Sequence, residues 1–319
     1  MQNKIYPLSH YEFIRVCGPD SRSFLQGQLS CNTDLLSDKR SLVGALCNLK
    51  GRVIADFRLL EIGGDCLLQC GKDMADPILA TLGNYAVFSK VELSQLDDDA
   101  AATPRAFGLI GATADAALAW LELTLPESTD QVSQSNSCSV MRLPGPATRI
   151  EIWFHSSAAQ DAFFSQANIE TSGNLDAWLR ADIEAGMIHV TKELSEEYTP
   201  QLLNYDIAGL IDFKKGCYTG QEIVARMFYR GTAKKRLYLL SSNVEVSADS
   251  RVVLAKKPGA ADESTGSDIL AYNNNESSSL LLAVLTSETV ESGEKLQLSD
   301  KAGSVLSIQS LPYAEIPTK

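Results

Sequence analysis

Residues 214–222 read KKGCYTGQE, and IVAR follows at residues 223–226. A short apolar run, GLIDF at residues 209–213, precedes this stretch, so the pattern predicts a tight glycine turn followed by a helix. Thr219 and Glu222 have the T-x-x-E spacing of a capping box. In such a box, each of the two side chains accepts a hydrogen bond from the backbone N–H of the other residue. We therefore expect Thr219 to be the N-cap of this helix.

Cys217 lies two residues before this predicted N-cap. The unpaired amides and the dipole of a helix N-terminus favour an anion, and Lys214 and Lys215 add positive charge nearby. These conditions favour a reactive thiolate. Residue type alone favours the opposite interpretation, because a free cysteine is usually a small buried residue. The complete string, discussed below, is what favours a reactive cysteine.

Length, composition and charge restrict the class of protein. A chain of 319 residues exceeds one typical domain, and 45% apolar with 21% charged residues is ordinary for a globular protein. The net charge of −12 argues against broad binding to nucleic-acid backbones. The positive charge is concentrated in one basic strip, which suggests that the protein binds an anion rather than bulk nucleic acid. The strip contains Lys214, Lys215, Arg226, Arg230, Lys234, Lys235 and Arg236.

The seven cysteines are scattered and form no C-x-x-C pair, and the chain has only three histidines. We therefore expect no metal site. The N-terminal residues lack the apolar segment of a signal peptide, and no apolar run reaches the roughly 18 residues of a membrane helix. These features predict a cytoplasmic protein with reduced thiols and no membrane contact.

The order of predicted elements indicates an α+β fold with antiparallel sheets. The first part contains predicted helices at Asp20–Leu29 and Asp73–Tyr85 and strands at Tyr11–Cys17, Leu42–Leu49, Val53–Ile62, Cys66–Cys70 and Ser89–Leu93. A similar order returns with helices at Asp115–Leu123 and Ala158–Gln166 and strands at Ala106–Ile110, Ser139–Leu143 and Thr148–Phe154. Residues Pro126 to Ser137 are polar and predict a loop.

A further helix is predicted from Asn174 or Asp176 to Met187, and a polar loop from Thr191 to Leu203. From Leu237 onward, short apolar runs alternate with turn residues, which is typical of a small β-barrel or sandwich. We therefore predict an α+β region over residues 1–236, with similar sub-units at roughly 1–100 and 101–236, and a β-barrel over residues 237–319.

The KGCYTGQE motif at residues 215–222, followed by IVAR, resembles the signature of the YgfZ family. Three other segments resemble family segments in the right order, namely residues 24–28, residues 85–91, and Trp178 with residues 183–186. YgfZ proteins bind folate and are linked to iron–sulfur enzyme maturation and tRNA modification. The family is related to the aminomethyltransferase (T-protein) of the glycine cleavage system. The resemblance implies a folate-binding ring of two ferredoxin-like units with a C-terminal β-barrel.

The resemblance also implies site residues. Cys217, Lys215 and Asp56 are the candidates for chemistry, and tetrahydrofolate or a one-carbon derivative is the expected cofactor. The candidates for folate binding are Tyr11, Trp178, Glu184, Tyr218, Gln221, Arg226 and Arg230. Four of these have an alternative: Tyr11 and Trp178 could be core residues, Glu184 a solvated helix carboxylate, and Arg226 a partner of Glu222 at i,i+4.

One departure separates this chain from the aminomethyltransferases, which carry a Gly-Gly-x-x-Asp-Asp string. The corresponding residues 51–56 read GRVIAD, so the second glycine is arginine and one acidic position is alanine, while Asp56 remains. We therefore favour a folate-binding accessory protein for iron–sulfur enzymes, including those that modify tRNA, that acts as a monomer. The alternatives are a folate-dependent one-carbon transferase and a thiol redox enzyme, although the latter lacks an evident resolving cysteine.

Overall fold

A computed structural model of the chain describes residues 4–96, 104–111, 113–166, 170–171, 174–231, 233–255, 266–275 and 278–313. The chain divides into two compact units. Unit 1 contains Met1–Leu175, His189–Pro200 and Gly209–Ala225, and unit 2 contains Asp176–Ile188, Gln201–Ala208 and Arg226–Lys319. Among the described helices, none is long and apolar enough to cross a bilayer.

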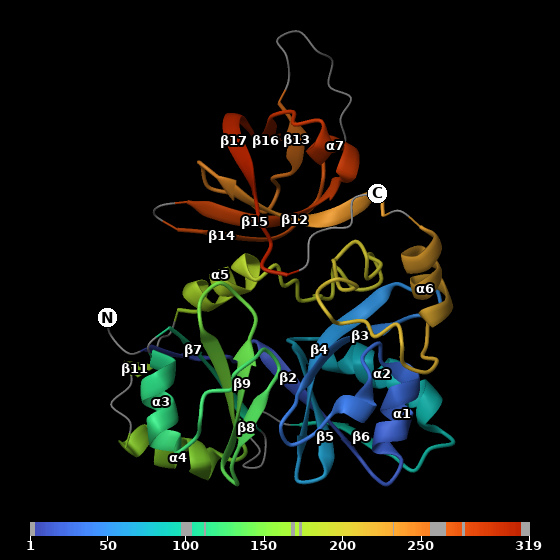
Figure 1. Cartoon of the computed structure of the whole chain (residues 1–319), viewed down its shortest axis with the longest axis vertical. Helices are drawn as coiled ribbons and strands as arrows, with labels where there is room; N and C mark the ends of the chain where they lie inside the picture. Colours follow the sequence, from blue (N-terminus) through green and yellow to red (C-terminus); the bar gives the residue numbers. More distant parts are fainter. Residues whose placement is uncertain are drawn as a thin grey trace. The chain divides into compact units, whose positions relative to one another are not determined.

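The first half of unit 1 is an antiparallel sheet with the strand order β3-β4-β5-β2-β6 (Figure 1, blue). Its strands are β2 Tyr11–Cys17, β3 Leu42–Cys47, β4 Val53–Ile62, β5 Asp65–Gly71 and β6 Glu92–Gln95. The connections contain α1 Ser21–Gln28, the 3-10 helix η1 Thr33–Leu35 and α2 Ala75–Ala86. Strand β4 is buried over its first eight residues, as expected for an interior strand covered on both faces.

The second half of unit 1 is a sheet with the order β11-β1-β7-β10-β9-β8 (Figure 1, green apart from the blue N-terminal strand β1). Its strands are β1 Lys4–Pro7, β7 Arg105–Ile110, β8 Val132–Gln134, β9 Cys138–Leu143, β10 Arg149–Phe154 and β11 Glu170–Thr171. Its helices are α3 Thr113–Leu121 and α4 Ser157–Gln166. Phenylalanines on β7, β10 and α4 pack together, with ring centroids of Phe154 and Phe163 5.2 Å apart.

The two halves repeat one topology, because β8-β9-β10-β7 in the second sheet follows the order of β3-β4-β5-β2 in the first. The N-terminal strand β1 then lies between β7 and β11, where the first sheet has β6 directly beside β2. The predicted repeat of pattern is thus confirmed. The predicted loop at Pro126–Ser137 is wrong in part, since it contains β8, a polar three-residue edge strand too short to show alternation.

Polar side chains join the two sheets of unit 1. Arg58 on β4 donates from Nη1 to Asp130 Oδ1 (2.7 Å) and to Ser41 Oγ (2.9 Å). Gln69 on β5 donates to Glu151 of β10, which also accepts from Trp153 Nε1 (2.7 Å). Because strand residues alternate between faces, Asp56 lies on the same face of the first sheet as Arg58. Asp56 therefore faces the polar region between the sheets.

Unit 2 begins with helix α5 Asp176–Glu184, and Gly186, two residues after its end, has a left-handed conformation (φ +68°). Such a glycine is the usual way to end a helix. The predicted end at Met187 is three residues later than the observed end, because Gly186 closes the last turn: its N–H donates to the carbonyl of Ile183 (2.9 Å).

The C-terminal part of unit 2 is a curled antiparallel sheet with the order β13-β16-β17-β12-β15-β14 (Figure 1, orange and red). Its elements are β12 Lys235–Ser242, β13 Val252–Leu254, β14 Ile269–Asn274, β15 Ser279–Thr286, α7 Ser287–Glu291, β16 Leu296–Leu298 and β17 Lys301–Gln309. The predicted barrel is confirmed as this half-barrel, whose core contains residues such as Leu240, Leu281 and Leu298. Helix α6 Gln221–Arg230 begins in unit 1 and ends in unit 2.

Candidate functional site

The motif loop, defined here as residues 212–220, is fixed to the first half of unit 1 by hydrogen bonds. Asp212 accepts at Oδ1 from the N–H groups of Lys214 (2.7 Å) and Lys215 (3.1 Å), which forms a tight polar turn. The Asp212 N–H donates to the carbonyl of Ser30 (2.9 Å), and Ser30 Oγ donates to the carbonyl of Leu210 (2.7 Å). The loop therefore has little freedom at its N-terminal end.

Lys215 anchors the loop from inside the protein. Its Nζ donates to the carbonyl oxygens of Gln26 (2.7 Å), Leu29 (2.5 Å) and Cys31 (2.8 Å), at and just beyond the last turn of α1. A cation here satisfies carbonyls that have no intrahelical partner and lies at the negative end of the helix dipole. Burial lowers the pKa of Lys215 to about 8. Its Nζ also lies 5.2 Å from the ring centroid of Tyr218.

The start of α6 differs by one residue from the predicted capping box. The helix begins at Gln221, and the Tyr218 N–H donates to Gln221 Oε1 (3.2 Å). Thr219 instead donates from Oγ1 to Gln28 Oε1 of α1 (2.9 Å). The predicted register at Thr219 and Glu222 is thus wrong, because tertiary contact with α1 engages the threonine hydroxyl.

Gly220 explains why the chain can turn so tightly before α6. Its φ is +82°, and a Cβ atom at this position would lie 2.4 Å from the carbonyl oxygen of Asn48. Gly51, with φ +69°, lies in the turn after β3, and a Cβ there would lie 2.9 Å from Ile223. The two glycines therefore allow the turn of residues 48–52 to contact the beginning of α6.

Cys217 is exposed on this fixed loop, whereas Cys31, Cys47, Cys66, Cys70 and Cys138 are buried. Burial raises the pKa of the Cys31 and Cys47 thiols to about 12 and that of Cys66 to about 11. It also raises the pKa of Cys70 and Cys138. A buried thiol that resists ionisation is a poor nucleophile. Cys17 is half-buried, so Cys217 is the most exposed of the seven cysteines and the one best placed for reaction with a second molecule.

A second cluster in unit 1 contains Asp56, His189 and Tyr11. Asp56 accepts from the Val190 N–H at Oδ1 (2.6 Å) and contacts His189 Nδ1 through Oδ2 (2.8 Å). His189 Nε2 lies 3.3 Å from the Tyr11 hydroxyl, and the two rings meet edge to face with centroids 5.7 Å apart. The side chain of His189 is 29% exposed. A carboxylate, an imidazole and a phenol thus form one hydrogen-bonded row.

The structure brings the predicted residues of unit 1 together as two groups. Lys215, Cys217, Tyr218 and Gln221 form the junction of the motif loop and α6, and Tyr11 and Asp56 belong to the second group. The two groups contact neighbouring parts of β3 and β4. Asp56 pairs with Ala45 across these strands, and Cys47 of β3 interacts electrostatically with Tyr218. Burial raises the pKa of Tyr218, so its phenol stays protonated.

The other predicted residues lie in unit 2. Trp178 on α5 is fully buried, which is the state that the core-packing alternative requires. Glu184, the last residue of α5, forms an ion pair with Arg180, with 3.2 Å between Oε1 and Nε. Arg226 and Arg230 are exposed on α6. Contacts of these four side chains with a ligand remain predictions.

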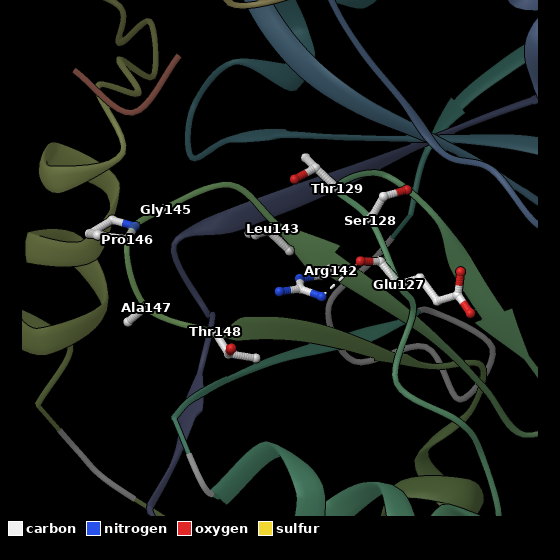
Figure 2. A pocket seen from close by; sticks show the side chains of 9 residues that line it. All are labelled: Glu127, Ser128, Thr129, Arg142, Leu143, Gly145, Pro146, Ala147 and Thr148. Carbon is white, nitrogen blue, oxygen red and sulfur yellow. Dashed lines mark hydrogen bonds between the residues drawn. The ribbon is translucent and has the colours of Figure 1, made fainter.

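A polar hollow of about 300 Å³ lies elsewhere in unit 1, at β9 and the turn that follows it (Figure 2). Arg142 on β9 extends beside it and donates from Nη1 to the carbonyl of Glu127 (2.8 Å). The lining residues are Glu127, Ser128, Thr129, Arg142, Leu143, Gly145, Pro146, Ala147 and Thr148. This set contains none of the residues predicted from the sequence, so we do not assign the hollow to the candidate site.

Two contributors were missed by the sequence analysis. His189 was counted only as one of three histidines, and Asp212 only as part of an apolar run. Nothing in the local spacing connects His189 with Asp56, which is 133 positions away in the chain. Asp212 had a usable signal, because an aspartate just before a turn commonly accepts from the amides that follow it.

No family model matches the chain. Curated proteins do: "tRNA-modifying protein YgfZ" of Klebsiella pneumoniae (strain 342) is 32% identical over 310 residues, which cover 96% of this chain and 92% of that protein. The protein of the same name from Yersinia enterocolitica is 32% identical over 307 residues, covering 96% and 91% of the two chains.

Among solved structures, aminomethyltransferase T of the glycine cleavage system from Bartonella henselae superposes with a TM-score of 0.75. It is 17% identical, and the match covers 98% of this chain and 86% of that one. This likeness shows that the two share an α+β fold. With relatives more than 30% identical over nearly its whole length, the chain belongs to the YgfZ family.

Proposed function

We propose that this protein binds tetrahydrofolate or a one-carbon derivative and supports the assembly or repair of iron–sulfur enzymes, including enzymes that modify tRNA. The names of its curated relatives support the connection with tRNA modification. The fold shared with aminomethyltransferase T supports a folate-type ligand by analogy. In this proposal the protein is a cytoplasmic accessory factor whose partners are folate and the iron–sulfur enzymes themselves.

The observation that carries the proposal is the contrast between Cys217 and the buried cysteines. The Cys217 thiol is exposed on a loop that Lys215 and Asp212 hold in place. A rigid loop keeps a reactive group in a defined position, which suits a thiol that must meet a partner protein rather than pack in a core. We therefore assign Cys217 the central role in the accessory activity.

The side chains present fit a folate-type ligand. Such a ligand needs a carboxylate or another acceptor for its amino-pyrimidine edge, aromatic surface for its pterin and cations for its glutamate tail. Asp56 is a buried carboxylate with two protein donors and remaining lone pairs, and Tyr11 supplies an adjacent aromatic ring. We propose that Asp56 and Tyr11 of unit 1 contact the pterin. Trp178, Glu184, Arg226 and Arg230 of unit 2 stay predicted folate-binding residues. Bound tetrahydrofolate would supply a reduced carrier of one-carbon groups.

Binding and thiol function can be tested separately. Calorimetry with 5-formyltetrahydrofolate, a stable reduced folate, should detect binding to the parent protein and to the Cys217→Ser variant alike. The activity of an iron–sulfur enzyme that modifies tRNA should fall in cells that carry only Cys217→Ser at the parent's protein level. Absence of folate binding, or full enzyme activity with Cys217→Ser, would contradict the corresponding part of the proposal.

A one-carbon transferase is the competing function. Asp56 supports it, because this aspartate is the acidic residue that remains of the Gly-Gly-x-x-Asp-Asp string of the aminomethyltransferases. Incubation of the protein with tetrahydrofolate and candidate aminomethyl donors separates the two functions. The accessory function predicts no catalytic formation of 5,10-methylenetetrahydrofolate. Repeated turnover that is lost in Asp56→Asn would establish the transferase instead.

A further inference from the structure

We propose that His189 is a titratable positioning residue, which sets through Tyr11 the direction of a hydrogen bond in the candidate site of unit 1. The inference begins from the row Asp56–His189–Tyr11, with heavy-atom distances of 2.8 Å and 3.3 Å. Histidine is the side chain that ordinarily changes charge between pH 5 and 8. The row therefore contains a protonation switch at its centre.

Asp56 fixes which nitrogen of His189 faces Tyr11. An ionised carboxylate can only accept, so the nitrogen beside it, Nδ1, must carry a hydrogen. In the neutral imidazole, Nε2 then has a lone pair and accepts from the Tyr11 hydroxyl. In the imidazolium, Nε2 donates instead, and the phenolic oxygen of Tyr11 must accept. Protonation of His189 thus turns the Tyr11 hydroxyl hydrogen away from the imidazole.

Two histidines lie at the row, His189 within it and His10 against the Tyr11 ring, and the inference concerns His189 because it contacts both Asp56 and the Tyr11 hydroxyl. Asp56 faces it from β4, Tyr11 and its neighbour His10 from β2 and the preceding turn, and Val190 binds the second Asp56 oxygen. Cys70 on β5 interacts with Asp56 but stays a thiol, because burial raises its pKa. Arg58 interacts electrostatically with Tyr11 and stays cationic, because Asp130 and Glu151 raise its pKa.

The consequence for a ligand rests on the proposed function. Folates carry carboxylates and carbonyl acceptors, and their carboxylates remain ionised above about pH 5.5. A protonated His189 adds a positive charge and lets Tyr11 act as a donor, and both changes favour an acceptor-rich anion. We therefore expect affinity to rise as the pH falls through the His189 transition. This would make ligand binding by unit 1 sensitive to pH.

The first test needs no ligand. NMR spectra of protein labelled in its histidine and tyrosine rings are recorded from pH 5 to 8.5, with assignments from His189→Gln and Tyr11→Phe. Tyr11 signals should shift with the same midpoint as His189, and this shift should vanish in His189→Gln. His155→Gln is the matched control, since His155 Nε2 also meets a hydroxyl, Ser139 Oγ (2.8 Å). The inference is overturned if the Tyr11 signals of the parent do not shift at the His189 midpoint, or if they shift in the same way in His189→Gln.

The second test measures binding of 5-formyltetrahydrofolate at pH 5.5 and pH 8.0 in the same variants. The parent and His155→Gln should bind about two- to tenfold more tightly at the lower pH, the range that one hydrogen bond provides. His189→Gln should bind with equal affinity at both. If the parent does not bind the folate at all, the proposed function fails, while the NMR result still decides whether His189 directs Tyr11. If His189→Gln keeps the parent's pH dependence, only the inference fails.

Discussion

The two halves of unit 1 share one topology, but different segments of the chain pack against their sheets. In the second half, α3 and α4 pack on the sheet, and Phe107, Phe154, Phe163 and Phe164 form aromatic contacts. The first half has the helices α1 and α2, and it is also joined by segments that return from much later in the chain, residues 189–200 and 209–225. The Val53 N–H donates to the carbonyl of Tyr198 (2.9 Å), and Val190 binds Asp56.

This difference indicates where function arises in a duplicated architecture. The returning segments carry Cys217, Lys215 and His189, and they attach to β3, β4 and α1 of the first half. The second half contains none of the predicted site residues and keeps an apolar core. We infer that the second half is chiefly a scaffold, whereas polar contacts in the first half position the site.

The largest effect should come from breaking the aromatic core of the second half. Phe154 is 1% exposed, so Phe154→Ala should lower the free energy of unfolding by about 3–5 kcal/mol. Urea unfolding measures the loss, and mass spectrometry measures alkylation of Cys217 in the folded variant. The alkylation rate should stay at the parent's value. A Cys217 rate that changes severalfold would show that the second half is more than a scaffold.

Lys215→Met should cause the next largest loss of stability, because the carbonyl oxygens of Gln26, Leu29 and Cys31 lose the donor that Lys215 Nζ provides. We expect a loss of about 2–4 kcal/mol in the free energy of unfolding. Lys214→Met is the matched control, since Lys214 is the exposed neighbour and should change stability by less than about 0.5 kcal/mol. Equal losses in the two variants would exclude the anchoring role of Lys215.

The same anchor should give a characteristic pH dependence. The folded-state pKa of Lys215, about 8, lies below its ordinary value of 10.5, so the unfolded chain binds more protons between these pH values. The stability of the parent relative to Lys215→Met should therefore rise from pH 8 to pH 10.5, by up to roughly 3 kcal/mol. Urea unfolding of both proteins across this range measures the difference. A relative stability that falls would contradict burial as the dominant influence on Lys215.

Gly220→Ala should produce a smaller loss in the first half. The new Cβ would meet the Asn48 carbonyl at 2.4 Å in a backbone conformation with φ +82°, which costs about 1–3 kcal/mol. Gly216→Ala is the control, because no atom lies within 4 Å of a Cβ there. Thermal unfolding and the Cys217 alkylation rate are compared for both. A Gly220→Ala protein as stable as Gly216→Ala would contradict the tight approach of the turn to α6.

Cys217→Ser should have the smallest effect on stability, within about 0.5 kcal/mol, because the thiol is exposed. Cys47→Ser, by contrast, places a hydroxyl at a fully buried position and should cost about 1–3 kcal/mol. Urea unfolding under reducing conditions compares the two. A large loss with Cys217→Ser would mean that this cysteine is structural and would remove the main support for the proposed function.

The sequence by itself determined the local and repetitive features. Hydrophobic alternation located most strands and helices, and the order of elements indicated the repeat and the β-rich C-terminal part. The KGCYTGQE motif identified the family because a string of that length is specific. Cys217 was placed before a helix for the same local reason, since glycine and capping residues act over a few positions.

Only the tertiary structure decided which side chains meet. Hydrogen bonds between residues far apart in sequence made Lys215 a cap for α1 and engaged the Thr219 hydroxyl with Gln28 of α1. They also joined His189 to Asp56 across 133 positions. Local pattern cannot report such pairs, because a buried polar group takes whichever partner the packed sheets and returning loops bring within reach.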